Sequence, residues 1–276
     1  MTPLPAPRGV SAPGATAAVF DHGAHLVSWV PAGSSEVIFL SSAAFLDSAA
    51  AIRGGVPICF PWFGPGRTGS MAPAHGFARR SAWTLADSER SADQVVLTYT
   101  LDDSAIVSET FTSSFRAVYR IGIGQSLDLD LTIENTGDVE FSFEEALHTY
   151  LAVGNVEQVR IEGLDGVDYL DKAAGGTACR QDADVIFSGE TDRIYRSSAD
   201  LTVVDPVRER RILVTRRNSS DVVVWNPWRD KGEALSDLGV GEWQGFVCVE
   251  GANVLDSAIA LVPGEAHSMG YSLRLA

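Results

Sequence analysis

The sequence predicts an all-β protein, built as an antiparallel sandwich or barrel, and three observations support this. In SLDLDLTIEN (126–135) leucine or isoleucine alternates with aspartate, threonine and glutamate, which is the pattern of a strand with one wet face. Similar apolar segments recur at close spacing with turn-forming residues between them. Helical signals are few and short. Strands in such close succession pack as a sandwich or close into a barrel.

Five further segments are predicted to be strands: VVLTYTL (95–101), FRAVYRIGI (115–123), RILVTRR (211–217), DVVVWN (221–226) and HSMGYSLRL (267–275). Residues 135–138 (NTGD) and 263–265 (PGE) supply turn chemistry. Residues 218–221 (NSSD) are predicted to join two strands as a hairpin. Residues 41–52 have an apolar face and are either a helix or a strand followed by a loop.

The domain organisation is predicted to be simple. The chain has 276 residues, 45% of them hydrophobic, which is enough for one large core, and all-β domains often reach this size. No internal repeat, low-complexity tract or linker interrupts it. We therefore expect a single domain over residues 1–276, in which residues 1–15 are the segment most open to disorder.

The formal net charge of −15 limits the partners. A nucleic-acid-binding protein needs a basic face, and the same charge opposes anionic membrane surfaces. We expect neither partner, and a monomer rather than an oligomer. A small anionic ligand remains compatible because exposed charges are screened beyond about 8 Å at physiological salt. The cations are 19 arginines and only two lysines.

The cysteines and the N-terminal segment predict a reducing, cytoplasmic location. Cys59 and Cys248 lie inside apolar runs and are predicted to be buried, whereas Cys179 does not. An odd number of widely spaced cysteines argues against a disulfide framework. Residues 1–14 lack the apolar stretch of a signal peptide, and no run approaches the roughly 20 apolar residues of a membrane-spanning helix.

Two acid–base candidates lie on predicted strands. If residues 141–153 (FSFEEALHTYLAV) form a strand, His148 shares a face with Glu144 and Tyr150. It is either a hydrogen-bonded structural histidine or a titrating group with a pKa near its ordinary value of about 6.5. Glu250 is either solvated at a strand end or a buried functional carboxylate. No metal site is expected, because His22 and His25 lie in an extended segment.

Arginines gather near the segment IRGGVPICFPWFGPG (52–66). Four of them fall within 28 residues that contain no lysine: Arg53, Arg67, Arg79 and Arg80. A guanidinium can hold a phosphate in two-point contact. Gly54 and Gly55 lack the Lys-Ser/Thr that follows in a Walker motif, so they are predicted to free the backbone that places Arg53 at a pocket wall. Phe60, Trp62 and Phe63 are expected either to anchor this segment on the core or to supply one ring that stacks on the ligand, with core packing favoured. Trp225 and Trp228 are likewise expected to pack.

Six segments carry a resemblance to a known family: IRGGVPICFPWFG, HGFAR, ALHTYL, ETDRIY, WNPW and FVCVE. In this order they resemble the glucose-6-phosphate 1-epimerases, or hexose-6-phosphate mutarotases, within the galactose mutarotase-like aldose 1-epimerases. The resemblance implies a large single-domain antiparallel β-sandwich with a concave sugar cleft. It also implies an isomerase that interconverts the α and β anomers of a hexose 6-phosphate, with no metal or redox cofactor.

The resemblance assigns the site residue by residue. His148 would be the general acid and Glu250 the general base, with the glutamate ionised, the histidine protonated and the two on opposite sides of the C1–O5 unit of the sugar. The residues implied to bind substrate are Arg53, His75, Arg79 and Asp192.

The sequence departs from the family pattern before HGFAR, where relatives commonly carry glutamine and this chain has Ala74. Two alternatives therefore stay open. One is a mutarotase or epimerase for an unphosphorylated or modified aldose. The other is a sugar-binding module without catalysis.

Overall fold

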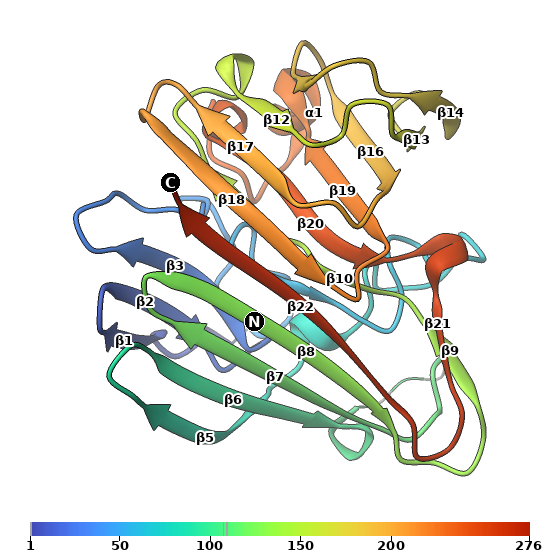
Figure 1. The fold of residues 1–276 in the computed structure, drawn as a ribbon. Coiled ribbons are helices and arrows are strands. Elements are labelled where there is room, and N and C mark those ends of the chain that lie inside the picture. Colours follow the sequence, from blue (N-terminus) through green and yellow to red (C-terminus); the bar gives the residue numbers. More distant parts are fainter. Residues whose placement is uncertain (1, 107, 109) are drawn as a thin grey trace.

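A computed structural model describes residues 2–106, 108 and 110–276. Within these residues the chain forms two large antiparallel sheets and two small ones (Figure 1). The predicted all-β class is therefore confirmed, and the large sheets pack as a sandwich rather than closing into a barrel. No helix in the described part of the chain has the length and apolarity needed to cross a membrane.

The first large sheet has nine strands in the order β15-β12-β17-β18-β22-β8-β7-β6-β5. Along its central strand β8 every second residue is buried, as the alternating sequence requires. The strands are β5 (Thr84–Arg90), β6 (Val95–Asp102), β7 (Phe115–Ile123), β8 (Ser126–Asn135), β12 (Arg160–Glu162), β15 (Val185–Ile186), β17 (Leu201–Asp205), β18 (Arg210–Arg217) and β22 (Ala266–Leu275).

The second large sheet has the order β14-β13-β16-β19-β20-β10-β4, and β11 also pairs with β20. Its strand β20 is buried along its whole length, so the sheet is covered on both faces at this strand. The strands are β4 (Ile58–Cys59), β10 (Glu145–Leu147), β11 (Tyr150–Ala152), β13 (Asp168–Asp171), β14 (Thr177–Arg180), β16 (Thr191–Arg196), β19 (Asp221–Asn226) and β20 (Phe246–Asn253).

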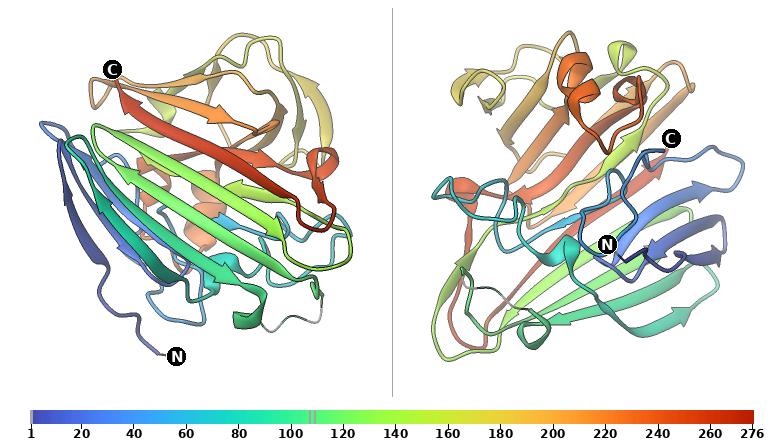
Figure 2. Two further views of the ribbon diagram at one scale, coloured as in Figure 1. Left: turned by 60° about the horizontal axis from the view of Figure 1, so that its bottom comes forward. Right: turned by 180° about the vertical axis from the view of Figure 1, so that it is seen from behind.

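The remaining elements are short. β1 (Arg8–Ala12), β2 (Ala15–Phe20) and β3 (His25–Pro31) form a three-stranded sheet, and β9 (Phe141–Phe143) pairs with β21 (Ile259–Leu261). The α-helix α1 (Trp228–Ala234) follows β19 directly (Figure 2). The short 3₁₀ helices are η1 (Ala78–Arg80), η2 (Asp103–Ala105), η3 (Val156–Gln158), η4 (Glu242–Gly245) and η5 (Leu255–Ser257).

The core lies between the two large sheets. One continuous cluster of buried residues takes Tyr119 and Leu131 from the nine-stranded sheet and Val224 and Val249 from the eight-stranded sheet. Burial of this apolar surface is the main stabilising term of such a fold. Cys59 and Cys248 are fully buried, as their apolar surroundings in the sequence predict.

Two local predictions differ from the structure. Residues 218–221 do not close a hairpin, because β18 pairs with β22 whereas β19 pairs with β16 and β20. The chain crosses here from one sheet to the other. The reason lies in the strands, since DVVVWN is apolar on both faces and suits the doubly covered sheet. Residues 41–52 form turns and one isolated bridge, between Asp47 and Pro3, and are neither a helix nor a regular strand.

Candidate active site

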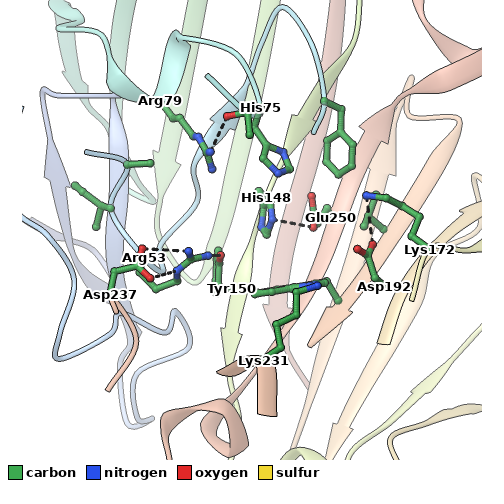
Figure 3. A pocket seen from close by; sticks show the side chains of 16 residues that line it. Arg53, His75, Arg79, His148, Tyr150, Lys172, Asp192, Lys231, Asp237 and Glu250 are labelled. Atoms are coloured by element: carbon green, nitrogen blue, oxygen red, sulfur yellow. Dashed lines mark hydrogen bonds and ion pairs between the residues drawn. The ribbon is translucent and has the colours of Figure 1, made fainter. Parts of the chain in front are cut away.

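A cavity of about 320 Å³ lies beside the eight-stranded sheet (Figure 3). Its wall is built from β11, β16, β19, β20 and α1 and from the loops around residues 51–53 and 74–79. All six residues that the sequence assigns to the site line it: Arg53, His75, Arg79, His148, Asp192 and Glu250. The structure thus brings together groups that are up to 197 positions apart, since Arg53 and Glu250 line the same cavity.

The sheet register places His148 beside Glu250. β20 pairs with β10 at Leu147↔Gly251 and with β11 at Tyr150↔Cys248, so residue 148 lies next to residue 250. The backbone N–H of His148 donates to the carbonyl of Pro57 at 3.0 Å. Nε2 of His148 lies 3.3 Å from Oε1 of Glu250.

This separation corrects one expectation. Two groups in contact leave no room for a sugar ring between them, so His148 and Glu250 do not lie on opposite sides of a substrate. They are neighbours on one wall of the cavity (Figure 3). The strand also continues past Glu250 to Asn253, and the carboxylate is fully buried rather than solvated at a strand end.

Burial shifts both members of the pair toward their neutral forms. Desolvation raises the pKa of Glu250 well above its ordinary value, and the nearby charge of Asp192 adds to the rise. Desolvation also lowers the pKa of His148 well below its ordinary value, and the neighbouring His75 and Arg79 lower it further. Burial therefore works against the expected ionised Glu250 and protonated His148 in the free site. Whether both groups are neutral or both are charged, the pair holds one transferable proton.

Several atoms of the pair remain free to meet a ligand. Within the described residues, neither carboxylate oxygen of Glu250 nor Nδ1 of His148 has a hydrogen-bond partner. Buried polar groups are almost always hydrogen-bonded, and exceptions concentrate at functional sites. The unsatisfied atoms thus favour a functional interpretation of both residues over a structural one.

Three polar contacts, two with Asp237 and one with Tyr150, fix Arg53 in the cavity wall. Its Nε and Nη2 lie 3.2 and 3.1 Å from the Asp237 carboxylate, and its Nη1 donates to the Tyr150 hydroxyl at 3.0 Å. The two following glycines adopt φ values of 109° and 71°, which side chains larger than glycine rarely adopt. The prediction that Gly54 and Gly55 free the backbone around Arg53 is confirmed.

His75 occupies a strained backbone position with φ of 64°. Its Nδ1 accepts from the backbone N–H of Gly64 at 3.3 Å and lies 3.3 Å from Sγ of Cys59, so the ring proton belongs on Nε2. Burial lowers the pKa of His75 well below its ordinary value. A neutral imidazole with Nε2–H can donate to a sugar oxygen. Strain of this kind is typical of functional sites.

Arg79 turns its guanidinium into the cavity beside His75 (Figure 3). Its Nη2 donates to the backbone carbonyl of Ala74 at 2.8 Å. This contact uses the main chain, so the replacement of the family's glutamine by alanine leaves it in place. Of the four clustered arginines, only Arg53 and Arg79 line the cavity. Arg67 lies on the surface, and Arg80 binds the carbonyl of Ala49.

Sequence reasoning missed both lysines of the chain. Lys172 and Lys231 line the same cavity. Lys172 lies 3.6 Å from Asp192 and 5.3 Å from the centre of the Phe63 ring, and Lys231 lies 2.6 Å from Glu190 at the surface. A signal was present, because a chain with 19 arginines that keeps two lysines invites the question of where those two lie. Tyr150 and Asp237 were also missed.

The aromatic residues divide between core and cavity. Phe60 and Trp62 are buried in the core, as predicted. Phe63 and Trp225 also pack against buried clusters, and in addition they line the cavity. The Trp225 ring lies 5.9 Å from the His148 ring, edge to face. Apolar ring surfaces beside polar groups suit a sugar, which presents both C–H faces and hydroxyls.

Two antiparallel sheets with a buried histidine–carboxylate pair in a cationic cavity define a galactose mutarotase-like protein. The chain belongs to the aldose 1-epimerase family, whose profile matches residues 10–274. The family resemblance of the sequence motifs is thereby confirmed.

The relatives cover most of the chain. A protein of Escherichia coli K12 named "Putative glucose-6-phosphate 1-epimerase" is 36% identical over 92% of this chain and 85% of its own length. A protein of the same name from Cenchrus ciliaris is 34% identical over 90% and 78%. The crystal structure of a "putative mutarotase" from Salmonella typhimurium superposes with a TM-score of 0.88 at 30% identity, covering 97% of this chain and 89% of that chain.

Proposed function

We propose that this protein is an isomerase that interconverts the α and β anomers of glucose 6-phosphate or a closely related hexose 6-phosphate. The observation that carries the proposal is the buried contact of 3.3 Å between His148 and Glu250 in a cavity lined by four cationic side chains. The names of the relatives supply the same reaction and substrate.

Ring opening needs one proton removed from the anomeric hydroxyl and one delivered to the ring oxygen. With both groups neutral, Nε2 of His148 accepts the proton from O1 while the Glu250 carboxyl donates its proton to O5. The C1–O5 bond breaks, a C1 carbonyl forms, and an imidazolium–carboxylate pair remains. Rotation about C1–C2 presents the other carbonyl face, and closure reverses both transfers. Each group of this kind contributes roughly 10²–10⁴-fold in rate.

The contact between the two groups suits this sequence. O1 and O5 are bonded to the same carbon, so they can face two neighbouring groups on one wall at the same time. The charged pair formed on opening is stabilised by its short separation in a buried site. Starting instead from the ionised pair, Glu250 is the base and His148 the acid, as the family resemblance implies. The neutral and the ionised starting states differ only in which of the two groups holds the shared proton.

The charge of the cavity supports a phosphorylated substrate. Among the described lining residues, four side chains are cationic (Arg53, Arg79, Lys172 and Lys231) and two carboxylates oppose them (Asp192 and Asp237). Two positive charges therefore remain when the acid–base pair is neutral, in a chain whose net charge is −15. A phosphate monoester carries about −1.5 to −2 at pH 7, which matches this excess.

The remaining residues would orient the sugar. Arg53, Arg79 and the two lysines would bind the phosphate and flanking hydroxyls, and Asp192 would accept from a hydroxyl opposite them. His75 would donate through Nε2 toward an oxygen of the ring. Orientation of this kind converts a slow reaction in water into a fast one within the complex.

The test is anomer exchange of freshly dissolved α-glucose 6-phosphate, followed by NMR or polarimetry, with the wild type and with Glu250→Gln. Acceleration by the wild type that the variant loses supports the proposal. Equal acceleration of glucose would favour the alternative of an unphosphorylated aldose, to which Ala74 points. Binding without acceleration would favour a sugar-binding module and overturn the enzyme.

We also propose that the protein acts as a monomer in the cytoplasm, with no nucleic-acid or membrane partner. Within the described chain all three cysteines are free thiols, which suits a reducing compartment. The net charge of −15 opposes anionic partners. Sedimentation at micromolar concentration tests the monomer, and fractionation of cells that express the protein tests its compartment.

A further inference from the structure

A third side chain completes a cluster around the acid–base pair, and the proposed reaction does not use it. Cys248 precedes Glu250 by two residues on β20, so both side chains lie on one face of the strand. Ligand atoms of His148, Cys248 and Glu250 all lie within 4.8 Å of one another, and all three residues are buried. Imidazole nitrogen, thiolate sulfur and carboxylate oxygen are the ligands that zinc prefers in proteins.

The geometry is close to that of a tetrahedral metal site. Zinc bonds of about 2.0–2.3 Å place neighbouring ligand atoms about 3.3–3.8 Å apart. His148 and Glu250 already meet this distance at 3.3 Å. Since all three ligand atoms lie within 4.8 Å of one another, no separation would have to shorten by more than about 1.5 Å to reach this range, a change that side-chain rotation can supply. Neither carboxylate oxygen of Glu250 has a hydrogen-bond partner in the described chain, so ligation replaces only the contact between Oε1 of Glu250 and Nε2 of His148.

We propose that His148, Cys248 and Glu250 form a binding site for a thiophilic divalent cation such as Zn²⁺, and that its occupation stops anomer exchange. His148 and Glu250 line the cavity, whereas Cys248 does not. An ion entering from the cavity meets the pair first and the sulfur behind it. Its fourth coordination position faces the cavity. The binding stands apart from the proposed function, and only the inhibition rests on it.

The charge balance makes binding feasible beside four cationic side chains. Burial raises the pKa of Cys248 well above its ordinary value, and the charge of Glu250 adds to the rise, so the thiol carries its proton in the free protein. Ligation requires that proton and the proton shared by His148 and Glu250 to leave. One divalent ion thus replaces two protons and leaves the net charge unchanged. Mg²⁺ and Ca²⁺ prefer oxygen ligands and do not compete for the thiol.

The binding is tested by titrating the full chain with Zn²⁺ in calorimetry, using buffers of different ionisation enthalpy. We expect one ion per chain and release of about two protons, falling to about one for Cys248→Ser. The variant should also bind at least about 100-fold more weakly, the upper end of what loss of an outer-shell partner costs. Co²⁺ should give a thiolate charge-transfer band with the wild type and none with Cys248→Ser.

Two variants serve as controls for the binding, and the activity assay tests whether Zn²⁺ inhibits anomer exchange. Cys59→Ser removes another buried thiol, on β4, and Cys179→Ser removes the partly exposed one; both should keep the Zn²⁺ affinity. Cys248→Ser should keep metal-free exchange and resist inhibition. Unchanged Zn²⁺ affinity in Cys248→Ser, or a Co²⁺ complex without the thiolate band, overturns the site. Wild-type protein that binds Zn²⁺ but never accelerates exchange overturns the function and leaves the site standing.

Discussion

Arg53 and Asp237 form a two-point ion pair across 184 residues of sequence, with the Nε–Oδ1 distance at 3.2 Å and the Nη2–Oδ2 distance at 3.1 Å. Because Nη1 also donates to the Tyr150 hydroxyl, the guanidinium has little freedom to follow a substrate. Arg53 therefore presents its charge from a fixed point. Lys231 is held differently, by the single surface carboxylate of Glu190.

The fixed position of Arg53 predicts that Arg53→Lys is not a conservative change. One ammonium group cannot reach both Asp237 and Tyr150 in the planar geometry of a guanidinium. We expect KM for the sugar phosphate to rise about tenfold, which corresponds to about 1.4 kcal/mol, while kcat changes little. Arg67→Lys is the matched control, since Arg67 is exposed and lies outside the cavity. A KM for Arg53→Lys equal to that of the control would contradict the fixed-charge role.

Lys231 is predicted to contribute to phosphate selectivity. Lys231→Gln removes one positive charge from the cavity, and loss of one charge-assisted contact of about 1.5 kcal/mol raises KM for glucose 6-phosphate roughly tenfold. Turnover of glucose should be unaffected. Lys231→Arg keeps the charge and should retain most of the affinity. Steady-state kinetics on the two sugars decides, and an equal loss on both would show that Lys231 serves the fold rather than the phosphate.

His148 and Glu250 are predicted to act as one unit. His148→Asn and Glu250→Gln should each lower kcat by roughly 10²–10⁴-fold, since either change breaks the paired transfer. The double variant should be about as slow as the slower single variant, because groups that act together are not additive. NMR exchange rates at saturating sugar phosphate measure this. A double variant slowed by the product of the two single effects would mean that the two residues act independently.

The strands were predictable because their sequences either alternate, with one solvent-exposed face, or form short apolar runs between turn residues. The predicted bounds of β7 and β19 match the structure, and β8 follows from alternation alone. The connection at 218–221 was not predictable, because turn residues fix a change of direction and not the partner of the next strand. Only the apolar character of β19 on both faces pointed to the other sheet.

The site residues that lie within sequence motifs were predictable. Those that only the packing of the fold brings to the cavity were not. His148 and Glu250 come from strand motifs, and their six-residue site is gathered in one cavity. Lys172 sits in the turn between β13 and β14, and Asp237 follows α1, so only packing brings them to the cavity. The protonation of Glu250 likewise depends on burial, which a strand pattern does not quantify.

A second histidine–carboxylate pair predicts a pH effect on stability. Nε2 of His267 lies 3.0 Å from Oε1 of the buried Glu145, and the hydrogen bond to this carboxylate raises the pKa of His267 above 6.5. A pKa raised by folding adds stability that is complete below the unfolded value and lost as the pH rises through the folded value. Stability should therefore decline with rising pH above about 6.5.

The variant His267→Gln tests this pair by urea unfolding across that pH range. Below pH 6.5 it should be destabilised by about 3 kcal/mol, the low end for breaking a buried ion pair, since the histidine is partly exposed. The difference from the wild type should shrink as the pH rises. A difference that stays constant with pH would show that the contact is a neutral hydrogen bond.

The close approach of the backbone at Gly54 predicts a large loss of stability for Gly54→Ala. A Cβ at this position would lie 2.4 Å from the carbonyl oxygen of Phe39 and 2.7 Å from Cα of Leu40, at a φ of 109°. The dihedral alone costs about 1–3 kcal/mol, and the contacts with backbone atoms add to it. We expect Gly54→Ala to lose more than about 3 kcal/mol of unfolding free energy and to displace Arg53, which raises KM.

Gly33→Ala is the control, because Gly33 has a φ of 77° but no atom within 4 Å of its Cβ, so it should lose only about 1–2 kcal/mol. Equal losses in urea unfolding would mean that the close approach to Phe39 does not constrain the segment that carries Arg53.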